Sequence, residues 1–127
     1  MRVIVAGSRS ITDREFVWGV LSQQCDISVI LSGEAPGPDR FGKEWARAHK
    51  LPVKVFLAEW KRCGKAAGIL RNLQMAKEGD RLLAFWDGQS RGTAHMIQCM
   101  RRAGKPVVIV TNKGVSHANE ARLPGCS

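Results

Sequence analysis

RVIVAGSR, residues 2–9, is a short and mostly β-branched apolar run that stops at a glycine. Runs of this kind are typical of strands that are buried on both faces of a parallel sheet. Similar runs recur along the chain, and together they predict five strands, at residues 2–6, 28–31, 53–56, 81–85 and 106–110.

The segments between these runs are typical of helices. Thr12 or Asp13 can cap the first helix, and Pro38 opens the second. The third is predicted over residues 66–77, with three apolar side chains directed inward: Ile69, Leu70 and Leu73. The fourth is predicted over residues 92–103, again with three inward side chains: Ala94, Ile97 and Met100.

Strands and helices therefore alternate along the whole pattern. This succession predicts an α/β fold, a doubly wound parallel sheet of about five strands with helices on both faces. Residues 1–110 are expected to form one domain, and the polar residues 111–127 a loose C-terminal tail. Residues 58–65 are expected to form a longer loop.

Composition is that of an ordinary globular chain, with 127 residues of which 44% are hydrophobic. No run approaches the ~18 apolar residues of a membrane span, and the first residues do not form a signal peptide, so we expect a cytoplasmic protein without a membrane partner. The four cysteines are scattered, without CxxC spacing or a histidine cluster. We therefore expect reduced thiols, no metal site and no cofactor.

Positive charge is concentrated in the second half of the chain. Residues 1–60 carry eight Lys/Arg and seven Asp/Glu, a net charge of +1, whereas residues 61–127 carry twelve and four, which gives +8 of the total +9. This distribution favours an anionic partner, although a solvated basic surface would have the same composition.

Three polar, glycine-containing loops directly follow predicted strands. They are GSR at residues 7–9, SGEAPGPDR at 32–40 and WDGQSRGT at 86–93. In a sheet of order 3-2-1-4-5, strands two, one and four are neighbours, and the topological switch point lies between one and four. We therefore expect the three loops to line a single crevice at the carboxyl edge of the sheet.

The residue types in these loops suit phosphate. Glycines let backbone N–H groups approach an anion, and helix N-termini point their positive ends into the same crevice. Ser8, Ser90 and Thr93 add hydroxyl donors, and Arg9 and Arg91 can make charge-assisted contacts. The alternative is that the glycines only serve tight turns between strands and helices.

Standard catalytic and nucleotide motifs are absent. The chain has neither GxxxxGK[ST] nor a GxGxxG after its first strand. Residues 88–92 match GxSxG, the nucleophile elbow of α/β hydrolases, but no Asp or Glu lies between Ser90 and His117, the histidine that would complete a triad. A serine hydrolase is therefore disfavoured.

Several single residues remain open to two interpretations. Asp39 and Asp87 could contact a ribose or cap a helix. Residues 71–72 (Arg-Asn) could reach the crevice or be solvated, and Trp60 could stack on a base or belong to the core. The same two roles are open to Trp86, and His95 could act as an acid or base or be a polar neighbour.

Taken together, the loop motifs resemble those of the SLOG superfamily, which includes DprA and the LONELY GUY phosphoribohydrolases. The residues that carry the likeness are GSR (7–9), SGEAPGPDR (32–40), Trp60 with AAGILRN (66–72) and Met75, and FWDGQSRGTAH (85–95). The small YspA/YpsA-like branch, with its SGGARGAD and DGxSRGT loops, is the most similar. The resemblance covers roughly residues 1–110, and it implies a Rossmann-like fold, self-association, and binding of nucleotides or ADP-ribose-like derivatives.

This chain departs from the family pattern at several places, among them Pro36 and Pro38, where Arg and Ala are usual. Glu34 replaces the branch's second glycine, and a carboxylate beside a phosphate is unfavourable, so we expect it to point away or to meet a ribose. The phosphoribohydrolases carry a glutamate in a GGxGTxxE loop, whereas Thr93 here is followed by Ala94, His95 and Met96. This difference favours a binding protein over an enzyme.

Three functions follow as hypotheses. The first is binding of a nucleotide derivative as a sensor or sequestering module, with self-association to a dimer or tetramer. The second is cleavage of the base from a nucleoside monophosphate, served by Arg71, Asp87, Thr93 and His95, and the third is DprA-like binding of single-stranded DNA. The predicted ligand-binding residues are Gly7, Ser8, Arg9, Ser32, Gly33, Glu34, Gly37, Asp39, Arg71, Asn72, Trp86, Asp87, Gly88, Ser90, Arg91, Gly92 and Thr93.

Overall fold

The computed structural model describes residues 1–111 and 114–117. Its strands are β1 (Arg2–Gly7), β2 (Val29–Ser32), β3 (Val53–Val55), β4 (Arg81–Phe85), β5 (Val107–Thr111) and β6 (Gly114–His117). Its helices are α1 (Arg14–Ser22), α2 (Pro38–Ala48), α3 (Trp60–Cys63), the 3₁₀ turn η1 (Gly64–Ala66), α4 (Ala67–Glu78) and α5 (Arg91–Arg102).

The sheet has the order β3-β2-β1-β4-β5-β6. Strands β1 to β5 are parallel, and β6 runs antiparallel to β5. The α/β class, the parallel sheet and the predicted order 3-2-1-4-5 are therefore confirmed. In this order β1 lies centrally, between β2 and β4, so the loops after these three strands emerge side by side.

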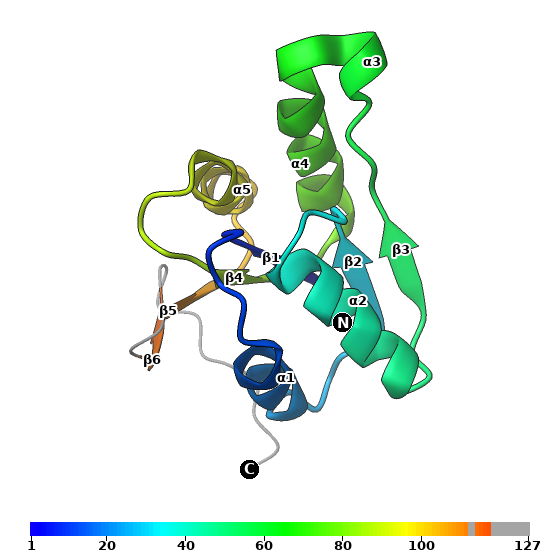
Figure 1. The fold of residues 1–127 in the computed structure, drawn as a ribbon, viewed down its shortest axis with the longest axis vertical. Helices are drawn as coiled ribbons and strands as arrows, with labels where there is room; N and C mark the ends of the chain where they lie inside the picture. Colours follow the sequence, from blue (N-terminus) through cyan, green and yellow to red (C-terminus); the bar gives the residue numbers. More distant parts are fainter. Residues whose placement is uncertain (112–113, 118–127) are drawn as a thin grey trace.

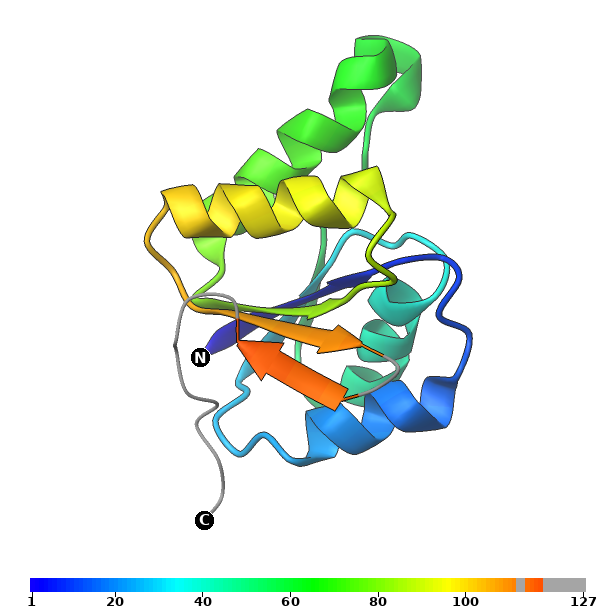
Figure 2. The same ribbon diagram turned by 90° about the vertical axis from the view of Figure 1, so that its left-hand side faces the viewer.

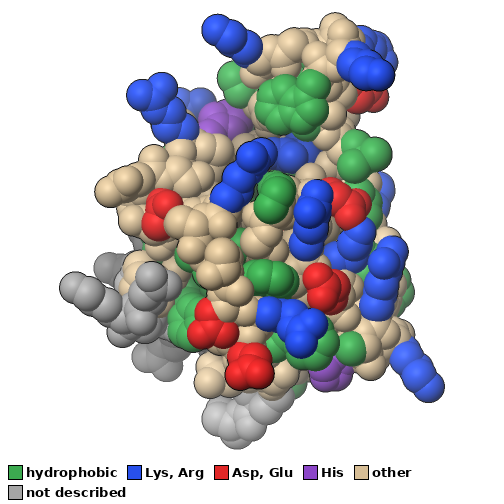
Figure 3. All heavy atoms as spheres, in the orientation of Figure 1, with side chains coloured by type: hydrophobic (Ala, Val, Ile, Leu, Met, Phe, Trp, Pro, Cys, Tyr) green, Lys and Arg blue, Asp and Glu red, His purple; other side chains and the backbone are tan. Residues whose placement is uncertain are grey.

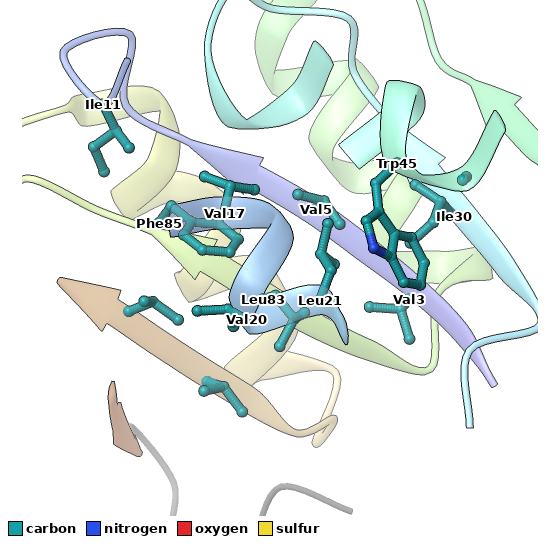
Figure 4. Close-up of a cluster of buried hydrophobic side chains, with 13 residues drawn as sticks. Val3, Val5, Ile11, Val17, Val20, Leu21, Ile30, Trp45, Leu83 and Phe85 are labelled. Carbon is teal, nitrogen blue, oxygen red and sulfur yellow. The ribbon is translucent and has the colours of Figure 1, made fainter. Parts of the chain in front are cut away.

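Two helical layers cover the sheet (Figures 1 and 2). Successive side chains of β1 alternate between them: Val3 and Val5 pack in the cluster with α1 and α2, whereas Ile4 and Ala6 pack in the cluster with α4 and α5. Figure 4 shows the first of these clusters, in which the apolar side of α1 lies against the sheet. Burial on both faces explains why the strands read as continuous apolar runs.

Local signals at the helix ends match the structure. The Asp13 carboxylate accepts the Phe16 N–H as the N-cap of α1, Pro38 occupies the first turn of α2, and Gly79 terminates α4. The Ser90 hydroxyl accepts the Thr93 N–H as the N-cap of α5. These caps fix where α2 and α5 begin, directly after the loops at the carboxyl edge of the sheet.

The third predicted helix exists, but the prediction of its buried side was wrong. Ile69, Leu70 and Leu73 are each about half exposed. The side chains that α4 buries are instead Ala67, Asn72, Met75 and Ala76. The physical reason is visible in Figures 1 and 2: α3 and the first half of α4 form an arm that projects beyond the sheet, so little packs against its outer side.

Other expectations for the chain also need correction. The expected loop at residues 58–65 contains α3 and most of η1. The expected tail begins with Thr111, which ends β5, and includes the strand β6; residues 118–127 lie outside the described residues. Cys63 and Cys99 are free thiols, as expected. Cys25 is disulfide-bonded, so the expectation of reduced thiols was wrong for this residue. Within the described residues, no helix has both the length and the apolar character to cross a membrane.

Candidate functional site

The loops after β1, β2 and β4 meet at the carboxyl edge of the sheet and are bonded to one another. The Ser8 hydroxyl accepts the Asp87 N–H at 3.0 Å, and the Ser10 hydroxyl donates to the Asp87 carboxylate at 2.7 Å. The Gly7 N–H donates to the Asp39 carboxylate at 3.2 Å. The convergence predicted from the strand order is therefore present, and side chains connect each pair of neighbouring loops.

A cavity of about 650 Å³ lies between these loops and the helices α4 and α5. Its volume falls within the range of about 300–1,000 Å³ that is usual for small-molecule sites. Figure 3 shows this side of the molecule, with Lys and Arg side chains beside apolar surface. The lining residues are Ala6, Gly7, Arg9, Ser10, Ala35, Asp39, Trp60, Lys65, Gly68, Ile69, Arg71, Asn72, Met75, Asp87, Ser90, Arg91, Gly92, Thr93, His95 and Met96.

The structure divides the predicted site residues into two groups. The ones that line the cavity are Gly7, Arg9, Asp39, Arg71, Asn72, Asp87, Ser90, Arg91, Gly92 and Thr93. The ones outside its lining are Ser8, Ser32, Gly33, Glu34, Gly37, Trp86 and Gly88. Several of the second group support the loops rather than face the cavity: the Ser32 hydroxyl, for example, donates to the Asp39 carbonyl and accepts the Glu34 N–H.

Asp39 lies at the floor of the cavity and is 4% exposed. Burial raises the pKa of its carboxyl from 3.8 to about 7, although the nearby Arg71 guanidinium and the N–H groups of Gly7 and Gly33 lower it. Of the two roles considered for Asp39, capping is not what the side chain does, because α2 has no side-chain cap bond. The carboxyl instead joins the loops after β1 and β2.

The raised pKa of Asp39 predicts a pH-dependent stability. Between about pH 4 and pH 7 the native state keeps a proton that the unfolded chain has lost, so the free energy of unfolding falls as the pH rises through this window. The slope is at most about 1.4 kcal/mol per pH unit. Urea unfolding of the wild type and of Asp39→Asn should show a stability difference that changes between pH 4 and 7 and is constant above it. A difference independent of pH would contradict this assignment.

Asp87 organises the turn between β4 and α5. Its carboxylate accepts the N–H groups of Gln89 and Ser90, both at 2.8 Å, and these bonds hold the pKa of this exposed side chain well below its usual range. Asp87 is therefore ionised at neutral pH. Because its oxygens are already engaged by the turn and by Ser10, we interpret the role of Asp87 as structural, with its ionised edge at the cavity wall.

Arg71 and Asn72, on α4, both turn toward the cavity rather than toward solvent. The Arg71 guanidinium donates to the Gly33 carbonyl at 3.0 Å, and its buried Nε has no hydrogen-bond partner. The buried Asn72 amide donates to the Gly92 carbonyl at 3.2 Å and lies 3.0 Å from His95 Nδ1. These contacts connect α4 to the loop after β2 and to the start of α5.

Glu34 points away from the cavity, which is one of the two outcomes expected for it. Its carboxylate pairs with Lys43 on α2, and it is not among the lining residues. Its φ of 62° lies in the left-handed region, where the family pattern has glycine. The ion pair therefore removes a negative charge from the site and holds the loop in a conformation that glycine adopts more easily.

The apolar side of the cavity was largely missed by the sequence reasoning. Trp60 reaches the cavity from α3, and Ile69 and Met75 line it from α4, with Met96 on α5. The Trp60 ring packs close to Gly68, where an added Cβ would lie 3.3 Å from it. Of the two tryptophans considered, Trp60 therefore lies in the cavity, whereas the Trp86 indole N–H donates to the Ser90 carbonyl and its ring lines a separate hollow of about 460 Å³.

Comparisons with known proteins agree with this architecture. The model of the YspA, cpYpsA-related SLOG family matches residues 1–63, which include β1, β2 and their loops. The chain is also similar to the Gene 61 protein of Mycobacterium phage D29, at 36% identity over 117 residues, which cover 84% of this chain and 94% of that protein. No solved structure matches.

Proposed function

Because the chain belongs to the YspA, cpYpsA-related SLOG family, we propose that it binds a nucleotide or nucleotide derivative in the cavity between its three loops. The family suggests a nucleotide-related function, and the cavity between the loops supports this location for the ligand. We further propose that the ligand is of the ADP-ribose type, a phosphorylated nucleoside with a second sugar, and that the protein senses or sequesters it as a homo-oligomer.

The positive charge of the cavity lining is the main observation that supports binding of a phosphorylated ligand. The lining has four cationic side chains, Arg9, Lys65, Arg71 and Arg91, against the carboxyls of Asp39 and Asp87. Burial keeps Asp39 largely protonated below pH 7, so the net charge facing a ligand is positive. Such a surplus in a partly enclosed cavity favours a ligand with several phosphate charges.

The start of α5 adds backbone donors to these side chains. Ser90, Arg91, Gly92 and Thr93 all line the cavity, and they form the N-cap and first turn of a helix of 12 residues. A helix N-terminus carries unsatisfied N–H groups and a partial positive charge, which together favour phosphate. No Cβ stands at Gly92, and nothing lies within 4 Å of the place where one would be, so a phosphate oxygen could approach the backbone here.

The opposite wall suits a base. Trp60 is 57% exposed and lines the cavity together with the apolar side chains of Ile69 and Met75. The Trp60 ring lies close to Gly68, where an added Cβ would be 3.3 Å from one ring carbon, so the backbone here limits the positions of an indole that could stack on a base. A ligand with phosphates at α5 and its base on Trp60 would use both walls.

Calorimetric titration tests the proposal. We expect ADP-ribose, NAD, AMP or a cyclic dinucleotide to bind with micromolar affinity, and we expect Trp60→Ala to weaken binding about tenfold without changing the stoichiometry. Val55→Ala, which changes an exposed apolar residue of β3 outside the cavity lining, is the matched control and should leave the affinity unchanged. If none of the four compounds bound at millimolar concentration, the proposal would be rejected.

A second candidate function is hydrolysis of the N-glycosidic bond of a nucleoside monophosphate. The observation in its favour is the Asp39 carboxyl, whose pKa of about 7 suits a general acid, with His95 also in the cavity lining. Incubation with nucleoside monophosphates followed by chromatography would reveal free base if this activity exists. We rank it second because the glutamate of the phosphoribohydrolase loop has no counterpart after Thr93.

A further inference from the structure

We propose that Asn72 selects the sugar of the ligand. Its side-chain oxygen accepts a hydrogen bond from a ribose hydroxyl, so that the cavity distinguishes ribonucleotides from deoxyribonucleotides. This inference rests on the proposed function, and it assigns one part of the ligand to one atom of the cavity.

The orientation of the Asn72 amide is fixed by its surroundings. Asn72 lies on α4 and is 4% exposed, and its amide nitrogen is 3.2 Å from the Gly92 carbonyl oxygen and 3.0 Å from His95 Nδ1. A carbonyl oxygen can only accept a hydrogen bond, so the nitrogen of the amide, rather than its oxygen, must face Gly92. The opposite orientation would bring two buried oxygens together and leave both without a donor, which is unfavourable.

The contact with His95 uses the second N–H of the amide. Because the Asn72 nitrogen can only donate, His95 Nδ1 must accept, and the ring proton is therefore on Nε2. Nε2 lies 3.5 Å from the sulfur of Cys99, a weak acceptor. These four residues form one chain of hydrogen bonds, in which both N–H groups of the amide are engaged.

The Asn72 side-chain oxygen is the part of the amide that remains for a ligand. Among the described residues this oxygen accepts no hydrogen bond. The fully buried side-chain atoms of the described chain that lack a partner are Arg71 Nε and Arg81 Nε, so the Asn72 oxygen is accessible, and Asn72 lines the cavity. An acceptor on a largely buried residue that opens into a cavity is suited to a donor from a ligand.

The donor that fits best is a sugar hydroxyl. Ionised phosphate oxygens only accept hydrogen bonds, so the donors of a nucleotide are its ribose hydroxyls and the N–H groups of its base. Gly68, beside the Trp60 ring, precedes Asn72 by one turn of α4, about 6 Å along the helix. Asn72 itself contacts Gly92 in the first turn of α5. A base on Trp60 and phosphates at α5 therefore leave the ribose beside Asn72.

The carboxylates of the cavity are less suited to this role. Asp87 already accepts two backbone N–H groups and the Ser10 hydroxyl, and Asp39 accepts the Gly7 N–H. An uncharged acceptor also avoids the repulsion that a carboxylate would exert on the neighbouring phosphates. The amide oxygen of Asn72 can therefore read a hydroxyl without opposing the anionic part of the ligand.

Calorimetric titration of the wild type tests the assignment without any change to the protein. ADP-ribose and AMP are compared with their 2′-deoxy and 3′-deoxy forms, which lack one hydroxyl of the adenosine ribose. AMP is also compared with IMP, which lacks the amino group of adenine. We expect one of the two deoxy forms to bind about tenfold more weakly than its parent compound, and IMP to bind about as tightly as AMP.

A substitution then shows whether Asn72 causes this preference. In Asn72→Leu the parent compound should bind about tenfold more weakly and no better than its deoxy form, so that the ratio of the two affinities falls to about one. Gln74→Leu removes an exposed amide from the same helix, outside the cavity lining, and should keep the wild-type ratio. Circular dichroism verifies that both variants are folded.

The orientation of the amide has a measurement of its own, which needs neither a ligand nor a variant of Asn72. Nitrogen-15 NMR of the imidazole rings, with His95→Gln to assign the signal, should show His95 as the Nε2–H tautomer. An Nδ1–H tautomer would mean that the amide oxygen faces His95, and the inference would be overturned.

The titrations can overturn it as well. Deoxy forms that bind as tightly as their parents, or a preference that persists in Asn72→Leu, would each contradict the role of this residue. Weaker binding of IMP alone would assign the oxygen to the base and not to the sugar. If none of the nucleotides bound, the proposed function itself would fail, whereas binding without a preference for ribose would leave that function standing and remove only this inference.

Discussion

Replacing Gly7 with alanine is expected to cost about 3 kcal/mol or more in the free energy of unfolding and to abolish ligand binding. Gly7 ends β1 at the point where the three loops meet. A Cβ at this position would lie 2.5 Å from both the Phe85 carbonyl oxygen and Pro38 Cγ. Real Cβ atoms do not approach other atoms so closely, and the carbonyl belongs to the neighbouring strand β4, so the backbone itself would have to move.

The displacement would reach the site directly. The Gly7 N–H donates to Asp39. The next residue, Ser8, donates its N–H to the Phe85 carbonyl at the end of β4, and its hydroxyl accepts the Asp87 N–H from the loop that follows. Moving β1 away from Phe85 therefore separates the loops from one another. Loss of stability and loss of the cavity have the same cause here.

Gly92→Ala is the matched control for this experiment. Gly92 also lines the cavity, but nothing lies within 4 Å of its added Cβ, and it sits in the first turn of α5, where alanine is tolerated. Urea unfolding followed by tryptophan fluorescence should show a large loss for the first variant and at most a few tenths of a kcal/mol for the second. Equal stabilities of Gly7→Ala and the wild type would contradict the packing described for β1.

Much of the fold could be predicted because the sheet is buried on both faces. Uninterrupted apolar runs then mark strands directly, and β4 was predicted with its observed bounds. The strand order followed from the succession of strands and helices, and with it the meeting of the loops that contain Gly7, Asp39 and Asp87. The strand order and the meeting of the loops are consequences of topology, and the pattern of strands and helices in a single sequence is enough to predict them.

The sequence could not predict which side of α4 is buried or which side chains line the apolar part of the cavity, because both depend on where the helices lie in space. Apolar side chains lie on two sides of α4, and the periodicity alone does not say which side is buried. The sequence favoured burial of Leu70 and Leu73, but these residues lie on the exposed side of the helix. The position of the Trp60 ring in the cavity lining follows from the packing of α3 against the beginning of α4, which the sequence does not show. Trp60 and Gly68 stand on either side of a short basic turn, and this spacing could have suggested that the two residues are in contact. The signal can be interpreted only when the projecting α3–α4 arm is known.

The role of Glu34 shows the same limit on a smaller scale. Its charge alone suggested that it would avoid a phosphate, and the family pattern marked it as unusual. Its partner, Lys43, is nine residues away in the second turn of α2, and only the observed conformation of the loop brings the two together. Departures from a motif can therefore be recognised from sequence, whereas their compensation generally cannot.

Arg71→Met is expected to weaken binding of the nucleotide derivative by about tenfold to a hundredfold, the largest effect we anticipate from a single side chain in the cavity. The guanidinium lies between the loop after β2 and the cavity, held by the Gly33 carbonyl at 3.0 Å, and its buried Nε has no hydrogen-bond partner. A donor that is positioned by one bond and left unpaired at another atom is suited to an anionic ligand.

Arg71→Met should also change how the affinity depends on pH. This second effect distinguishes the loss of a specific contact in the cavity from the loss of one positive charge anywhere on the surface. Arg71 lowers the pKa of Asp39, so its removal should raise that pKa further, and the affinity should become less dependent on pH around neutrality because Asp39 then stays protonated. Arg47→Met, an exposed arginine on α2 outside the cavity lining, removes the same charge and should leave both the affinity and its pH dependence unchanged. Calorimetry from pH 6 to 8 measures both quantities, and equal losses in the two variants would mean that the whole basic surface, rather than this cavity, attracts the ligand.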